Sequence, residues 1–111
     1  MLDIWMGSSP CTSEEINKGL ARLKSAGVKF RLSSQTKKMA CAKESKELPF
    51  LAGTDAYKFK TLTKFFSQSR VRNIMAIRGG YGGLRLLSLL DQWQPKSIKT
   101  MRDKQLWGFS D

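Results

Sequence analysis

The sequence of 111 residues has no histidine, only two cysteines and only three prolines. Without histidine, the chain cannot supply the most common general base of serine and cysteine hydrolases, nor the most common metal ligand. Cys11 and Cys41 have no metal-binding spacing, so we expect no metal. We expect no cofactor either. A disulfide between them is less favoured than two free thiols, which are typical of a reducing compartment.

The sequence also lacks an apolar run long enough to span a membrane, and its first residues lack the basic and apolar parts of a secretory signal. We therefore expect a cytoplasmic protein without a membrane span. The 41% hydrophobic and 10% aromatic content is typical of a globular chain, and the length suits one domain, residues 1–111.

The net charge of +11 has two interpretations. Lysine and arginine side chains that neutralise phosphates bind nucleic acids or anionic surfaces. Alternatively, the charge belongs to a solvated basic surface, or to a part of a protein whose acidic half lies elsewhere. The basic residues are scattered and accompany no RNA-binding, zinc-finger or heptad signature. We favour the second interpretation and do not expect a nucleic-acid partner.

Short apolar segments alternate with amphipathic ones along the chain. The expected strands cover residues 2–6, 28–32, 74–77 and 106–109. The expected helices begin at Thr12, at Thr54 or Asp55, and near Leu84. Glu15 lies three residues after Thr12, the spacing of a capping box. Strands that alternate with helices predict an α/β fold, with an open parallel sheet of about four strands and helices on both faces.

Residues 33–50 are polar and lysine-rich, without a clear apolar period. We interpret them as a long basic loop. Loops of this length in a compact domain are usually functional or poorly ordered.

In a parallel sheet, ligands bind beyond the carboxyl ends of the strands. Residues 78–83 leave the third predicted strand there with four glycines in six positions, and we call this segment the glycine loop. They match neither a dinucleotide fingerprint nor a phosphate-binding Walker loop. The remaining interpretations are an oxyanion hole built from backbone N–H groups, or a tight turn without a catalytic role.

The end of the sequence, Gly108-Phe109-Ser110-Asp111, is half of the nucleophile turn G-x-S-x-G. A serine hydroxyl needs a neighbouring base to become a good nucleophile, and this chain has no histidine to act as one. Ser110 is therefore a candidate nucleophile whose base lies outside the chain.

These motifs together resemble the LD-carboxypeptidases, serine peptidases that include muramoyl-tetrapeptide carboxypeptidases and the microcin C immunity peptidase. The resemblance covers nearly the whole chain. It is carried by residues 51–55 (LAGTD), 78–82 (RGGYG), 85–87 (RLL), 90–91 (LD) and 108–111 (GFSD). It implies a fold of the flavodoxin-like or class I glutamine amidotransferase-like type. It also implies cleavage of the peptide bond between an L-centre and a terminal D-amino acid in murein tetrapeptides during cell-wall recycling.

The resemblance assigns Ser110 as the nucleophile, and the backbone N–H groups of Gly80 (or Gly79) and Asp111 as the oxyanion hole. We also expect five residues to contact the substrate, which are Arg78, Gly79, Tyr81, Ser8 and Ser9. Arg78 has two equally supported roles, which are to bind the terminal carboxylate of the substrate or to pin the glycine loop.

In the family, the glutamate and histidine of the triad come from a second, C-terminal domain, which this chain does not contain. We therefore expect the chain alone to be inactive, and to self-associate through apolar surface that its partner would cover. The sequence differs from the family pattern at Lys58, where relatives usually carry arginine, and at Ser88, where they carry proline.

Two alternative functions have some support in the sequence. One is a non-catalytic basic module that binds nucleic acid or anionic surfaces, supported by the charge of +11. The other is a fragment of a general α/β hydrolase. The RGGYG segment argues against the hydrolase, because those enzymes place their oxyanion donors differently.

Overall fold

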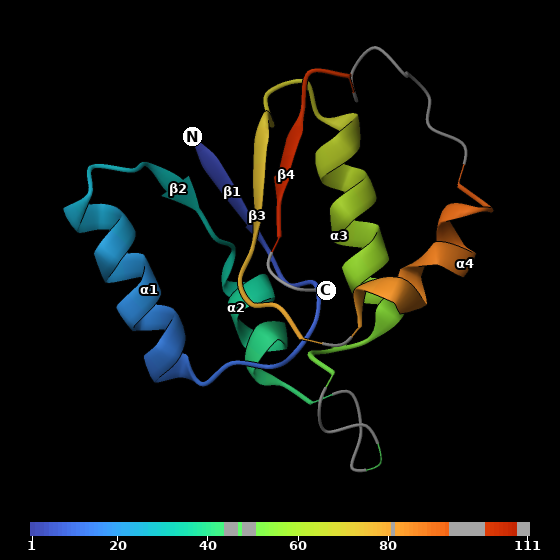
Figure 1. Ribbon diagram of the computed structural model, residues 1–111, viewed down its shortest axis with the longest axis horizontal. Helices are drawn as coiled ribbons and strands as arrows, with labels where there is room; N and C mark the ends of the chain where they lie inside the picture. The colour runs from blue at the N-terminus through green and yellow to red at the C-terminus, as the bar shows by residue number, and fades with distance from the viewer. Residues whose placement is uncertain (44–46, 48–50, 81, 94–101, 109–111) are drawn as a thin grey trace.

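Four parallel strands form the centre of the computed structural model, which describes residues 1–43, 47, 51–80, 82–93 and 102–108 (Figure 1). The strands are β1 (Leu2–Trp5), β2 (Phe30–Arg31), β3 (Asn73–Ala76) and β4 (Gln105–Trp107). Their order in the sheet is β2-β1-β3-β4, and every pairing is parallel. The predicted α/β class and open parallel sheet are confirmed.

Helices lie on both faces of this sheet. The structure contains α1 (Ser13–Ser25), α2 (Ser34–Cys41), α3 (Asp55–Ser67) and α4 (Leu87–Leu90), and a 3₁₀ turn over Gly83–Leu86 precedes α4. Figure 1 shows α1 and α3 on opposite sides of the sheet. Within the described ranges, none of the helices combines the length and the apolar character that a membrane span needs.

Each face of the sheet has its own apolar core. Trp5 and Ile74 alternate with the residues of the opposite face and pack with Leu62 of α3. On the other side, Met6 packs with Ile16 of α1 and Ala40 of α2. The continuous apolar run of residues 74–77 therefore has contacts on both faces, as expected for an inner strand of a parallel sheet.

The helix starts follow the local chemistry of the sequence. The Thr12 side chain accepts a hydrogen bond from the Glu15 N–H at 3.1 Å, and the Glu15 carboxylate accepts one from the Thr12 N–H at 3.0 Å. This reciprocal pair is the predicted capping box. At α3, Thr54 is the capping residue and accepts from the Tyr57 N–H.

Two sequence-based predictions were wrong in detail. The predicted loop over residues 33–50 contains the helix α2, which Ser33 caps by accepting from the Thr36 N–H at 3.0 Å. Its buried stripe consists of Thr36 and Ala40, too small and too polar a set to show an apolar period. Residues 44–46 and 48–50 lie outside the described residues.

The predicted second strand over residues 28–32 is also shorter, and β2 covers only Phe30–Arg31. The reason lies at the preceding helix, because the Val28 N–H donates to the Leu23 carbonyl. This bond ties Val28, which follows α1, back to the last turn of the helix, and Val28 does not join the sheet.

Candidate active site

The carboxyl ends of β1, β3 and β4 lie at one edge of the sheet. Trp5 pairs with Ala76, and Met75 pairs with Trp107, so the three strands end within about one residue pair of each other. The segment after β1 contains Ser8 and Ser9, and the segment after β3 contains the glycines. This edge is where an α/β protein places its ligands.

The loops after β1 and β3 touch each other directly. The Ser9 N–H donates to the Gly79 carbonyl at 3.4 Å. Gly80 has φ of 115°, and a Cβ atom placed on it would lie 2.0 Å from Ser9 Oγ. Only glycine fits this position, both for the backbone angle and for the space. The structure therefore brings together four predicted site residues, which are Ser8, Ser9, Gly79 and Gly80.

Arg78 connects the glycine loop to the start of α1. Its Nη1 donates to the Pro10 carbonyl at 3.1 Å and lies 3.4 Å from Oε2 of Glu15. Glu15 Oε2 also closes the capping box, so one carboxylate joins the helix start to the arginine. The Arg78 side chain is still 51% exposed. Its described contacts hold the loop, and its exposed part can still meet a ligand.

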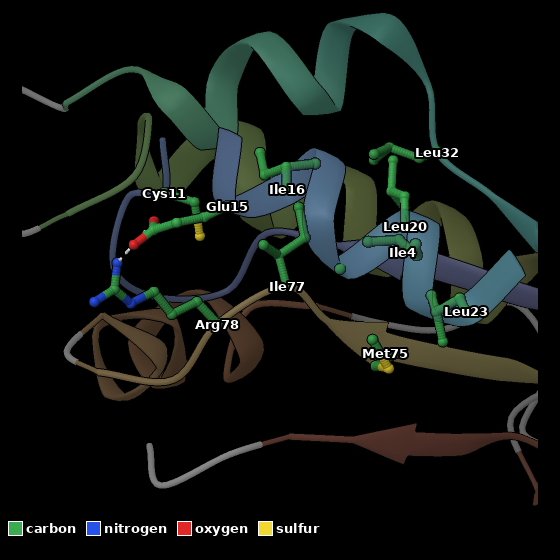
Figure 2. A pocket seen from close by; sticks show the side chains of 11 residues that line it. Ile4, Cys11, Glu15, Ile16, Leu20, Leu23, Leu32, Met75, Ile77 and Arg78 are labelled. Carbon is green, nitrogen blue, oxygen red and sulfur yellow. Dashed lines mark hydrogen bonds and ion pairs between the residues drawn. The ribbon is translucent and has the colours of Figure 1, made fainter. Parts of the chain in front are cut away.

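A cleft of about 430 Å³ lies between α1 and the face of the sheet formed by β1 and β3 (Figure 2). Apolar side chains of α1, of β1 and β3, and of the residues just after β2 and β3 line most of it, and Cys11, Glu15 and Arg78 lie at one end. Burial raises the pKa of the Cys11 thiol, and the nearby Arg78 guanidinium offsets part of this effect. A protonated, buried thiol is a poor nucleophile, so Cys11 does not replace the candidate serine.

The first turn of α3 also reaches this edge. Asp55 forms an ion pair with Arg85, whose Nε and Nη2 both lie 2.9 Å from Oδ2. The other carboxylate oxygen of Asp55 is buried and makes no hydrogen bond within the described part of the chain. This pair links α3 to the 3₁₀ turn that follows the glycine loop.

Lys58 also lies at this edge, although the sequence marks it only as a departure from the family pattern. Its side chain is fully buried, and Nζ donates to the Ser8 carbonyl at 3.5 Å. The spacing indicates its burial, because Lys58 lies four residues before the buried Leu62 and therefore on the same side of α3. Lysine is usually exposed, and this general preference hides the signal.

Three predicted site residues, Tyr81, Ser110 and Asp111, lie outside the described residues. The strand β4 nevertheless runs toward the candidate edge, and Gly108 follows it there. Within the described ranges, no group of three or more histidine, cysteine, aspartate or glutamate side chains gathers closely enough to hold a metal ion.

Comparison with known proteins gives one clear finding. The family model of the LD-carboxypeptidase N-terminal domain matches residues 3–111. No curated protein matches the chain significantly.

Proposed function

Because the chain belongs to the LD-carboxypeptidase family, as its match to the N-terminal domain shows, we propose that it is the nucleophile-bearing domain of a serine LD-carboxypeptidase. Membership in this family makes the chain part of a peptidase family. The finer proposal is that its substrate is a murein tetrapeptide, from which a terminal D-amino acid is removed during cell-wall recycling.

The observation that carries this proposal is the contact between the loops after β1 and β3. Ser9 meets Gly79 and Gly80 at the edge toward which β4 leads. Ser110 follows three residues after the end of β4 in the sequence. A nucleophile at this edge would lie beside the glycine loop, in which Gly80 has a positive φ.

In the proposed reaction, the Ser110 hydroxyl attacks the carbonyl of the scissile bond and loses its proton to a base. The backbone N–H groups of Gly80, or Gly79, and of Asp111 stabilise the negative charge that develops on the carbonyl oxygen. The base then gives the proton to the leaving nitrogen, and collapse of the tetrahedral intermediate releases the D-amino acid. Water hydrolyses the acyl-enzyme and regenerates the Ser110 hydroxyl.

The base is proposed to be a histidine, oriented by a glutamate, from a second domain. The sequence contains no histidine, so this partner is required by the chemistry of the nucleophile. Arg78, Tyr81 and Ser8 are proposed to contact the substrate, with Arg78 as the candidate partner of its terminal carboxylate. We place the reaction in the cytoplasm, in keeping with two cysteines that are free in the structure.

The proposal predicts that the purified chain alone releases no measurable D-alanine from a murein tetrapeptide. Loss of a triad base lowers turnover by roughly a million-fold in a serine protease. Added imidazole should supply a base in solution and restore slow release, and Ser110→Ala should abolish that release. Amino-acid analysis of the reaction mixture measures both effects.

Three outcomes would contradict the proposal. Release that depends on Ser110 without imidazole would show a base within this chain. Release that survives Ser110→Ala would show a different nucleophile. No release even in imidazole would argue against Ser110 as the nucleophile.

A further inference from the structure

Lys58 carries its charge into the interior beneath the candidate site. It lies in the first turns of α3, and its side chain has 0% exposure. Transfer of an ammonium group from water to a protein interior is unfavourable unless the group is hydrogen-bonded or paired. A lysine buried this completely therefore indicates polar partners that use its charge.

The ammonium lies where the two loops of the edge meet. Nζ donates to the Ser8 carbonyl at 3.5 Å, and the same carbonyl accepts the Ala52 N–H at 2.9 Å. Gly82 lies against it from the other loop, since a Cβ atom on Gly82 would be 3.1 Å from Nζ and 3.2 Å from Ser8 Cα. A side chain at position 82 would press on both neighbours, and its φ of 139° also requires glycine.

The backbone of Lys58 is fixed as well. The indole Nε1 of Trp5, the last residue of β1, donates to the Lys58 carbonyl at 3.0 Å. Lys58 is thus attached to β1 through its carbonyl and to the turn after β1 through its ammonium. This double attachment leaves the ammonium little freedom to leave the loops.

We propose that Lys58 is a positioning residue. It holds the segment after β1, at Ser8, against the glycine loop and thereby shapes the oxyanion hole. Its positive charge also favours the negative charge that develops at this edge during the reaction. The catalytic part of this inference rests on the proposed function. The positioning of the loops does not depend on it.

Amide hydrogen exchange tests the positioning directly. The Ser9 and Ala52 amides report on the two loop contacts, through their bonds to Gly79 and Ser8. The Ile77 amide, bonded to the Trp5 carbonyl, is the reference at the same edge. Lys58→Met should speed exchange at Ser9 and Ala52 by about tenfold or more relative to Ile77, because a hydrogen bond from a charged donor is lost.

The matched control is Lys60→Met, which removes an exposed ammonium from the same helix and should leave all three amides unchanged. Lys58→Arg keeps the charge and should retain most of the protection. Equal acceleration at Ile77, Ser9 and Ala52 would show a general loss of stability and overturn the positioning role. Unchanged exchange in Lys58→Met would overturn it as well.

A measurement on the unaltered chain covers the case in which Lys58→Met does not fold. Buried, hydrogen-bonded ammonium protons exchange slowly, so the Lys58 NH₃⁺ group should give an observable ¹H–¹⁵N signal with an Overhauser contact to Gly82 Hα. Absence of that contact would contradict the geometry on which the inference stands.

The catalytic part is tested in the imidazole-supported reaction. There, Lys58→Met should lower kcat more than it raises KM, and Lys58→Arg should restore part of kcat. If the unaltered chain shows no imidazole-dependent release, the proposed function fails while the exchange results still decide the positioning. If release occurs but Lys58→Met leaves kcat unchanged, the catalytic part of the inference fails alone.

Discussion

At the scale of single residues, the two cysteines show how environment separates identical groups. Cys11 is buried with 8% exposure at the end of the cleft beneath α1, and Cys41 is exposed. The two cysteines lie in neighbouring segments, because the Cys11 N–H donates to the carbonyl of Ala40, the residue before Cys41. Burial raises the pKa of the Cys11 thiol, so less of it is thiolate at any pH near neutrality.

We predict two phases when the chain reacts with a thiol-specific reagent such as Ellman's reagent at pH 8. Cys41 should react quickly, and Cys11 at least about tenfold more slowly, because its reaction needs both ionisation and local opening. Cys41→Ser should remove the fast phase, and denaturant should merge the two. Equal rates in the folded chain would contradict the burial of Cys11.

The same raised pKa has a consequence for stability. The unfolded chain loses the Cys11 proton at a lower pH than the folded chain does, so the folded state binds more protons in that window. The contribution of Cys11 to stability is therefore complete below the ordinary thiol pKa, and it is lost as the pH rises through the folded value.

At the scale of elements, the helix α2 depends on a capping residue and not on an apolar stripe. Ser33 Oγ accepts from the Thr36 N–H, and the Thr36 hydroxyl lies 2.8 Å from Ser33 Oγ. The buried positions Thr36 and Ala40 supply little apolar area. The start of α2 should therefore be sensitive to loss of its cap.

We predict that Ser33→Ala lowers the free energy of unfolding by about 1 kcal/mol, the usual effect of removing a capping side chain. Urea denaturation followed by circular dichroism measures it. The matched control is Ser34→Ala, one residue further on, which is exposed and begins the helix without capping it. Equal losses in the two variants would contradict the capping role.

At the scale of the whole molecule, apolar surface at β4 supports the proposal of self-association. All three residues of β4 are exposed, and Leu106 and Trp107 show 49% and 56% of their surface. This strand is at the end of the described strand order. Exposed edge strands with large apolar side chains are common association sites.

We predict that sedimentation velocity detects a mass that rises with protein concentration. Because each chain carries a charge of +11, added salt should strengthen the association by screening repulsion. Trp107→Lys should weaken it by about tenfold or more. Leu84→Lys, which changes a 66% exposed leucine outside β4, is the control. A single monomeric mass at all concentrations and salt levels would contradict the prediction.

Much of the fold could be predicted from local sequence patterns, and the failures have a physical cause. The capping box of Thr12 and Glu15 and the apolar run after Asn73 act over a few neighbouring residues, so they are visible in the sequence. The helix α2 was not predicted, because its buried residue Ala40 packs with Met6 and Cys11, which are distant from it in the sequence. Contacts between distant segments leave no local period.

By itself, the sequence determined the α/β class, the glycine loop, the absence of histidine and the family to which these motifs belong. Only the tertiary structure decided that Ser9 touches Gly79 and that Lys58 is buried beneath them, because these residues come from three separate segments. The free energy of a buried ammonium depends on the groups that surround it in space. Those around Lys58 come from segments distant in the sequence, so the sequence around position 58 does not by itself decide its burial.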